Sequence, residues 1–195
     1  MRKIKSKEDI EKRQRVNHIV IGVLLMFIML SSTIGFALFS GGGSIGNSNN
    51  LEYNGIDFMT NEQGLWKFEI EDDTFQTSFH PLDTQDIVLG FDFNVNEISG
   101  KPLYYVKDSE NAVSELLYNI GRYAQRYQEV CLEGEKCEKD LIEKSCADSI
   151  IVFKSVENQP IKIYKDNKCV FIEAPTAEQV KAADRLIFKS LNIQE

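Results

Sequence analysis

The chain has 195 residues and a formal net charge of −8. The charge is uneven, because residues 1–18 carry seven Lys/Arg against three Asp/Glu and the remainder therefore carries −12. An acidic surface of this size repels phosphates, which excludes nucleic acid as an expected partner. The basic N-terminal segment instead suits a surface of anionic lipid headgroups.

Residues 19–39 form an uninterrupted apolar run of twenty-one residues without an ionisable side chain. As a helix the run would be roughly 30 Å long, which matches the hydrocarbon core of a bilayer. The alternatives are a buried helix of a soluble domain and a cleaved signal peptide, whose apolar core is usually about 7–15 residues. Bulky Phe39 also stands where a small residue would favour cleavage. We therefore expect an uncleaved transmembrane helix over residues 19–39.

The basic flank precedes this run, so the positive-inside rule places residues 1–18 in the cytoplasm as a short tail. The bilayer is then a partner through residues 19–39, and the span acts as an anchor because it lacks the ionisable residues of an ion pathway. Residues 40–50 are rich in Gly, Ser and Asn, which is typical of a flexible tether. Residues 51–195 are long enough for one extracytoplasmic domain.

The first half of this domain is predicted to consist of antiparallel strands. Apolar residues alternate with polar ones in several segments, as in a strand with one buried face. The expected strands cover residues 55–60, 65–70, 74–80, 89–95 and 103–106. Later in the chain, residues 149–153 form an apolar strand, and residues 161–164 and 169–172 flank a turn at Asp166 and Asn167, which predicts a hairpin.

Two amphipathic helices complete the pattern. The first begins near Asp108, Ser109 or Asn111, any of which can cap it, and apolar residues recur at spacings of three and four. Its apolar stripe consists of Val113, Leu116, Leu117, Ile120, Ala124 and Tyr127. A short helical piece is also expected around Leu141-Ile142. The last helix follows Pro175, with Thr176 and Gln179 as a capping box.

These elements predict an α+β fold: a mainly antiparallel sheet with two packed amphipathic helices, preceded by one transmembrane helix.

The four cysteines, Cys131, Cys137, Cys146 and Cys169, all follow the predicted span. Their spacings do not fit the C-x2–4-C pairs of structural zinc sites, and no C-x-x-C redox motif is present. An even number of cysteines in an oxidising compartment favours two disulfides, for which three pairings exist. Our hypothesis is Cys131–Cys137 and Cys146–Cys169. No metal or other cofactor is expected.

No motif marks a catalytic residue. The chain lacks G-x-S-x-G, Walker and H-E-x-x-H patterns, and His80, the one histidine in the outer domain, precedes Pro81 as a strand-end residue would. Acidic residues gather in two turns without the regular spacing of a calcium loop, so solvated turns are the preferred interpretation. These acids are Glu69, Glu71, Asp72, Asp73, Asp83 and Asp86.

Five tyrosines could contribute to a binding face, because tyrosine is favoured at interfaces, although the edge of the core would hold them equally well. They are Tyr104, Tyr105, Tyr118, Tyr123 and Tyr127.

The segment NGIDFMTNEQGLWKFEI, the C-x5-C loop and the C-terminal NKCVFIEAPTAEQVKAADRLIFKSLNI resemble uncharacterised single-pass membrane-anchored proteins from archaea. The resemblance covers most of the outer domain and implies no reaction. Asp184 and Arg185, within that last segment, are expected to be structural residues on the polar side of the final helix.

We expect a binding or assembly module of the cell envelope, which would act on an envelope or membrane protein partner. The alternative is a hydrolase-like envelope enzyme whose site forms no motif; a polar pocket around His80 would favour it. A sensor would need a membrane partner, because the tail of eighteen residues is too short for a signalling domain.

Overall fold

The structure is a computed structural model that describes residues 20–21, 26, 50–137 and 140–194. The predicted span, residues 19–39, and the tether, residues 40–50, lie almost entirely outside the described residues. Within the described part of the chain, no helix has the length and apolar composition needed to cross a bilayer. The membrane anchor therefore stays a prediction. Residues 48–195 form a compact unit of their own.

The unit begins with a four-stranded antiparallel meander in the order β1-β2-β3-β4. The strands are β1 Asn50–Tyr53, β2 Ile56–Thr60, β3 Trp66–Ile70 and β4 Asp73–Thr77. The predicted alternation is confirmed, because Phe58, Phe68 and Phe75 all point into one core. The turn between β1 and β2 is Asn54-Gly55, both with positive φ, as a tight hairpin requires.

The second sheet has five strands in the order β10-β11-β9-β5-β6. Its strands are β5 Pro102–Val106, β6 Arg126–Glu129, β9 Ile150–Ser155, β10 Lys162–Asp166 and β11 Cys169–Ala174. Only β10–β11, the predicted hairpin, is antiparallel, whereas β11–β9, β9–β5 and β5–β6 are parallel. The prediction of a mainly antiparallel sheet is therefore right for the meander and wrong for this sheet. The cause is that β9 is buried on both faces, as strands of parallel sheets are.

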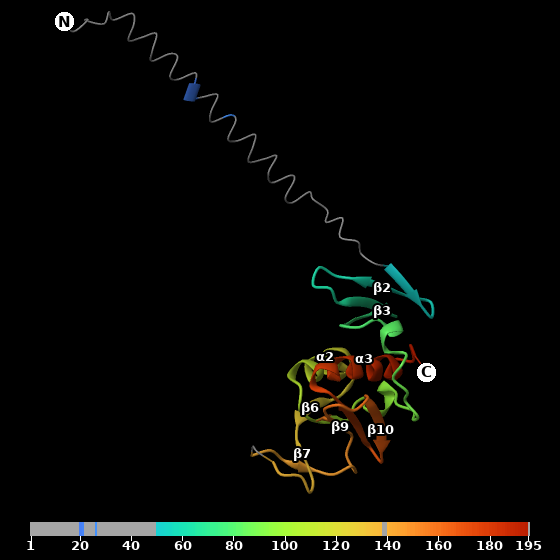
Figure 1. The fold of residues 1–195 in the computed structure, drawn as a ribbon, viewed down its shortest axis with the longest axis vertical. Helices are drawn as coiled ribbons and strands as arrows, with labels where there is room; N and C mark the ends of the chain where they lie inside the picture. The colour runs from blue at the N-terminus through green and yellow to red at the C-terminus, as the bar shows by residue number, and fades with distance from the viewer. Residues whose placement is uncertain (1–19, 22–25, 27–49, 138–139, 195) are drawn as a thin grey trace, which may run out of the picture. The chain divides into compact units, whose positions relative to one another are not determined.

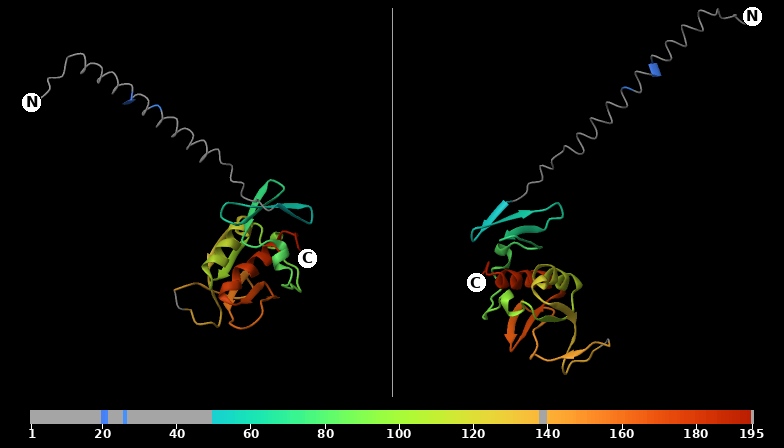
Figure 2. Two further views of the ribbon diagram at one scale, coloured as in Figure 1. Left: turned by 45° about the horizontal axis from the view of Figure 1, so that its top comes forward. Right: turned by 180° about the vertical axis from the view of Figure 1, so that it is seen from behind.

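Two helices, α2 Glu110–Ile120 and α3 Gln179–Ser190, pack against each other between the two sheets (Figures 1 and 2). Ser109 caps α2, since its side chain accepts a hydrogen bond from the N–H of Ala112. The helix ends at Ile120, earlier than predicted, and the chain passes through a 3-10 turn, η3 Gly121–Tyr123, into β6. Tyr127 of the predicted helical stripe therefore lies in a strand, where parallel pairing with β5 outweighs the helical pattern.

Three other local predictions are wrong. The segment around residues 89–95 makes one bridge at Leu89 and then a 3-10 turn, η2 Val95–Glu97. The expected helical piece near Ile142 is replaced by a strand pair, β7 Cys131–Leu132 with β8 Glu143–Lys144. The capping box at Thr176 does not form, because its hydroxyl bonds to Ser155 and a 3-10 turn, η4 Thr176–Glu178, precedes α3. A fourth 3-10 turn, η1 Pro81–Thr84, follows the meander.

The buried residues fall into three cores. The main core lies between the helices and one face of the five-stranded sheet, and the meander core joins the three phenylalanines above to Phe188 and Ile193. The third core covers the opposite face of the five-stranded sheet, where Tyr104, Val130 and Val152 pack beneath the cysteine-containing loop. Among the described residues no helix packs on this face, and Leu132 and Cys146 of the loop pack against it instead (Figure 1).

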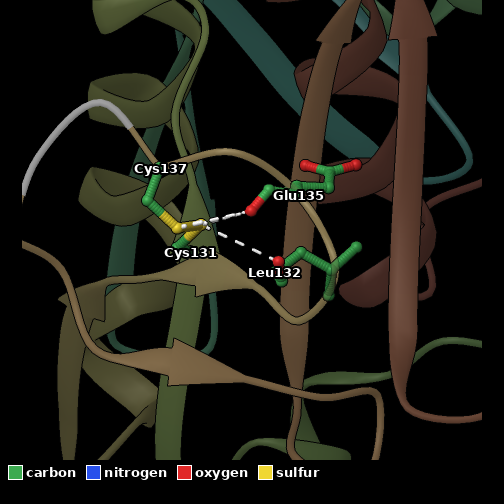
Figure 3. The surroundings of a disulfide bond; sticks show 4 residues. All are labelled: Cys131, Leu132, Glu135 and Cys137. Atoms are coloured by element: carbon green, nitrogen blue, oxygen red, sulfur yellow. Dashed lines mark hydrogen bonds between the residues drawn. A yellow bond between two sulfur atoms is a disulfide. The ribbon is translucent and has the colours of Figure 1, made fainter.

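Both hypothesised disulfides are present in the structure, and the described residues contain no free cysteine. Cys131–Cys137 closes the turn after β7, where the carbonyl oxygens of Leu132 and Glu135 approach the sulfur of Cys131 (Figure 3). Cys146–Cys169 joins the loop to the first residue of β11, and Cys169 is fully buried. The second bond therefore attaches the cover to the sheet.

We expect loss of Cys146–Cys169 to destabilise the protein more than loss of Cys131–Cys137. A disulfide stabilises more when it closes a longer loop, because it restricts the unfolded chain more. The chain-entropy estimate of this stabilisation is about 3 kcal/mol for Cys146–Cys169 and about 2 kcal/mol for Cys131–Cys137. Cys169 is also buried in a core. Urea denaturation of the full chain in detergent, followed by Trp66 fluorescence, would compare C146S/C169S with C131S/C137S. Equal midpoints for the two double variants would contradict this ranking.

Candidate functional site

An open pocket of about 450 Å³ lies where the end of β4 meets helices α2 and α3. Four of its lining residues come from one face of α2, at helical spacings of three and four. The apolar residues on the opposite face of α2 pack in the main core, so the face that lines the pocket is the polar one. The lining consists of Leu65, Gln76, Ser78, Asn111, Ser114, Glu115, Tyr118 and Val180.

Glu115 holds the end of the meander. The backbone N–H of Ser78 donates to Glu115 Oε1, and the hydroxyl of Ser78 donates to Oε2 at 2.7 Å. One helical turn later, Asn119 exchanges two hydrogen bonds with the backbone of Gln76, at 2.9 and 2.7 Å. The strand is thereby fixed to α2 at two positions, and the Ser78 hydroxyl is aligned on a carboxylate.

Asp184 lies behind Glu115, on α3. It is fully buried, and its Oδ2 accepts a hydrogen bond of 2.8 Å from the N–H of Phe79. Burial raises the pKa of Asp184 well above its ordinary value, and the neighbouring Glu115 carboxylate raises it further. The other oxygen, Oδ1, has no hydrogen-bond donor among the described residues. The raised pKa favours the protonated form of Asp184, in which this buried group carries no charge.

The site therefore contains a serine hydroxyl, a carboxylate that accepts from it and a buried carboxyl whose raised pKa favours its protonated form. No sequence motif marked Ser78 or Glu115, and Asp184 was expected only as a structural residue of the final helix. Ser78 and Glu115 are 37 residues apart, and Phe79 and Asp184 are 105 apart. The one available signal was the polar pair Asp184-Arg185 inside an otherwise apolar helix.

The prediction that Asp184 and Arg185 lie on the polar side of the final helix is wrong. Both are buried, because α3 packs against α2 and against cores on two sides, and only residues near its ends reach solvent. Arg185 donates to the carbonyl of Ile87 and to Gln194, at 2.8 Å each. Arg185 is thus part of a buried network, whereas Asp184 lies behind Glu115, a residue of the pocket lining.

His80 does not line the pocket. Its ring is buried against Trp66 and Phe58, at centroid distances of 4.8 Å each. Nδ1 accepts a hydrogen bond from the N–H of Leu82, which leaves the proton on Nε2, and Nε2 has no partner among the described residues. Burial lowers the pKa of His80. A neutral, enclosed imidazole of this kind serves the turn that follows β4.

The acidic residues weighed as a calcium site lie apart in ion pairs and turns. Asp73 pairs with Arg122, and Asp86 pairs with Lys181 at 3.0 Å, a contact that lowers the pKa of Asp86. Asp83 accepts from the backbone of His80. Across residues 50–137 and 140–194, no three His, Cys, Asp or Glu side chains come close enough to hold a metal ion.

The five tyrosines do not share one face. Tyr104 is buried beneath the cysteine loop, and Tyr105 and Tyr123 pack against the main core. Tyr118 and Tyr127 are more than half exposed, and of the five only Tyr118 lines the pocket.

A second open hollow of about 610 Å³ lies beside Cys146 and is lined by Ser145, Ala147, Asn167 and Lys168 as well. These are loop and turn residues, and the hollow brings no carboxylate next to a hydroxyl. It offers less chemistry than the pocket at Glu115.

No family model, curated protein or solved structure matches this chain. The site must therefore be interpreted from its own geometry.

We expect Asp184→Asn to raise stability relative to the wild type as pH increases from about 4. The unfolded chain ionises Asp184 near its ordinary pKa, whereas the folded chain does so only at higher pH. The wild type therefore loses stability over that interval and the non-titrating amide does not. Thermal unfolding of both full-length proteins from pH 4 to pH 8 would measure the divergence.

Asp86→Asn is the matched control, because Asp86 is an exposed acid whose pKa is lowered rather than raised. Its contribution is lost as pH falls, so this variant should show no gain toward neutral pH. Parallel curves for the wild type and Asp184→Asn would show that Asp184 is ionised in the folded state.

Proposed function

We propose that this protein is a single-pass, membrane-anchored binding module whose extracytoplasmic domain takes up a peptide segment of an envelope protein. The two disulfides support this compartment, because such bonds persist in oxidising, extracytoplasmic environments. The basic flank of the apolar run supports the orientation.

The pocket at Glu115 is the observation that carries the proposal. It is concave, it collects side chains from three elements, and its polar groups converge beside apolar ones, as in ligand sites generally. His80, which an enzyme of the kind first considered would have needed, is enclosed elsewhere. Binding is thus better supported than histidine-dependent hydrolysis.

The lining favours a peptide as the ligand. The side-chain amides of Gln76 and Asn111 can each donate and accept, which matches the N–H and C=O groups of an extended backbone. Leu65, Val180 and the exposed ring of Tyr118 offer apolar contacts to a ligand side chain. Glu115 is the one charged residue of the lining, so a ligand with a neutral or basic segment suits it.

Ser114→Trp should abolish peptide capture. Ser114 is an exposed lining residue, so an indole there fills the pocket without entering the core. The full chain in lipid nanodiscs would be screened against a displayed random-peptide library, and the enriched sequences would be compared between the wild type and the variant.

Gln159→Trp places the same indole on an exposed loop remote from the pocket lining and should leave capture intact. Failure of the wild type to enrich any peptide over Ser114→Trp would refute the proposal. Enrichment in a parallel glycan array instead would assign the pocket to a different ligand class.

The proposed orientation predicts that a thiol introduced by Ser44→Cys reacts with a membrane-impermeant maleimide added to intact cells. The four native cysteines are paired and should stay silent. Labelling only after the cells are opened would place the domain in the cytoplasm and overturn the topology. A cysteine introduced by Ser6→Cys in the basic tail is the control for the opposite side.

A further inference from the structure

Ser78 and Glu115 have the arrangement of a nucleophile and its base, and Asp184 lies beside the base. We propose that the pocket, beyond binding a peptide as inferred above, catalyses acyl transfer, with Ser78 as nucleophile and Glu115 as general base. The substrate class is a peptide or ester carbonyl presented by the bound ligand.

The first support is the contact between hydroxyl and carboxylate. Ser78 Oγ donates to Glu115 Oε2 at 2.7 Å, within the range expected of a nucleophile and its base. Both residues line the pocket, so a bound carbonyl can reach Oγ. Ser114 lies in the same pocket, and its hydroxyl makes no hydrogen bond to another described residue. The two serines therefore differ in activation although they share an environment.

The second support is the position of Asp184. Asp184 is buried beside Glu115, and its raised pKa favours the neutral form of Asp184 in the resting site. When Glu115 accepts the proton of Ser78, both carboxyls become neutral and the negative charge moves to the substrate oxygen. The buried side of the site is then free of unpaired charge in the transition state, which is favourable because buried ions are costly. Asp184 touches no substrate and acts as a positioning residue.

The third support is a set of donors for the oxyanion. The amides of Gln76 and Asn111 line the pocket, and neither side chain hydrogen-bonds to another described residue. Such free donors next to a nucleophile can stabilise the charge that develops on the carbonyl oxygen.

The reaction needs only solvent water as co-reactant. Oγ bonds to the carbonyl carbon while its proton passes to Oε2 of Glu115. The carbon–nitrogen or carbon–oxygen bond of the substrate then breaks, and the leaving group takes that proton. Water attacks the acyl-serine with Glu115 as base, the carbon–Oγ bond breaks, and Ser78 recovers a proton as the acid is released.

Labelling with a fluorophosphonate tests this proposal directly, because the reagent reacts covalently with activated serines. The full chain in nanodiscs would be treated from pH 4 to pH 8 and digested, and the labelled peptide would be identified by mass spectrometry. We expect the label on Ser78 and not on Ser114. Glu115→Gln should slow labelling by about 100-fold or more, which is the usual contribution of a general base.

Asp184→Asn should shift the pH profile of labelling more than its maximum rate, since a purely structural residue would change only the folded fraction. Circular dichroism of each variant gives that fraction. Absence of label on Ser78 in the folded wild type at every pH, or equal labelling of Ser114, would overturn the proposal. If the wild type captures peptides but is not labelled, the acyl-transfer proposal is refuted and the binding proposal stands. If the wild type captures no peptide, both proposals are refuted.

Discussion

The fold depends on the attachment of one strand end to two helices through carboxyl groups. Glu115 on α2 accepts both hydrogen bonds that Ser78 donates, and Asp184 on α3 accepts from Phe79. A four-stranded meander has one apolar face, which must be buried against another element. These contacts, with the ring of Phe188 in its core, place that face on the helix layer. Ser78 and Glu115 also line the pocket, so the contact that attaches the meander to α2 is part of the site.

The helix layer between two sheets explains why the polar residues of α3 did not predict an exposed face. A helix covered on one side shows a polar stripe, but α3 is covered by the main core on one side and by the meander core on another. Its polar residues Asp184 and Arg185 are consequently buried and each needs partners within the fold. The helices cover only one face of the five-stranded sheet. The opposite face is covered by the cysteine-containing loop between β6 and β9, which the Cys146–Cys169 disulfide attaches to the sheet.

Local signals predicted local structure well. The alternation around Phe58 and Phe68 identified β2 and β3, and the turn at Asn167 identified the β10–β11 hairpin, because neighbouring residues determine these elements. Strand direction in the second sheet was not predictable in this way. Parallel pairing of β5, β6 and β9 depends on crossovers through α2 and a long loop. The one local sign of it in the sequence was the continuous apolar run of β9, which is buried on both faces. The end of α2 at Ile120 likewise follows from strand pairing rather than from helical spacing.

The candidate site was invisible to motifs because no two of its three residues are close in sequence. A buried acid such as Asp184 is unusual, because burying a carboxyl group costs free energy unless the group is paired or neutral. A neutral Asp184 ties α3 to Phe79 no better than an asparagine of the same shape would, and it costs stability once the unfolded chain can ionise. Positions that break a local rule without a structural gain are where function is expected. A carboxyl beside Glu115 can take up or release a proton and an amide cannot, and the proposed chemistry of the Ser78–Glu115 pair would use this difference.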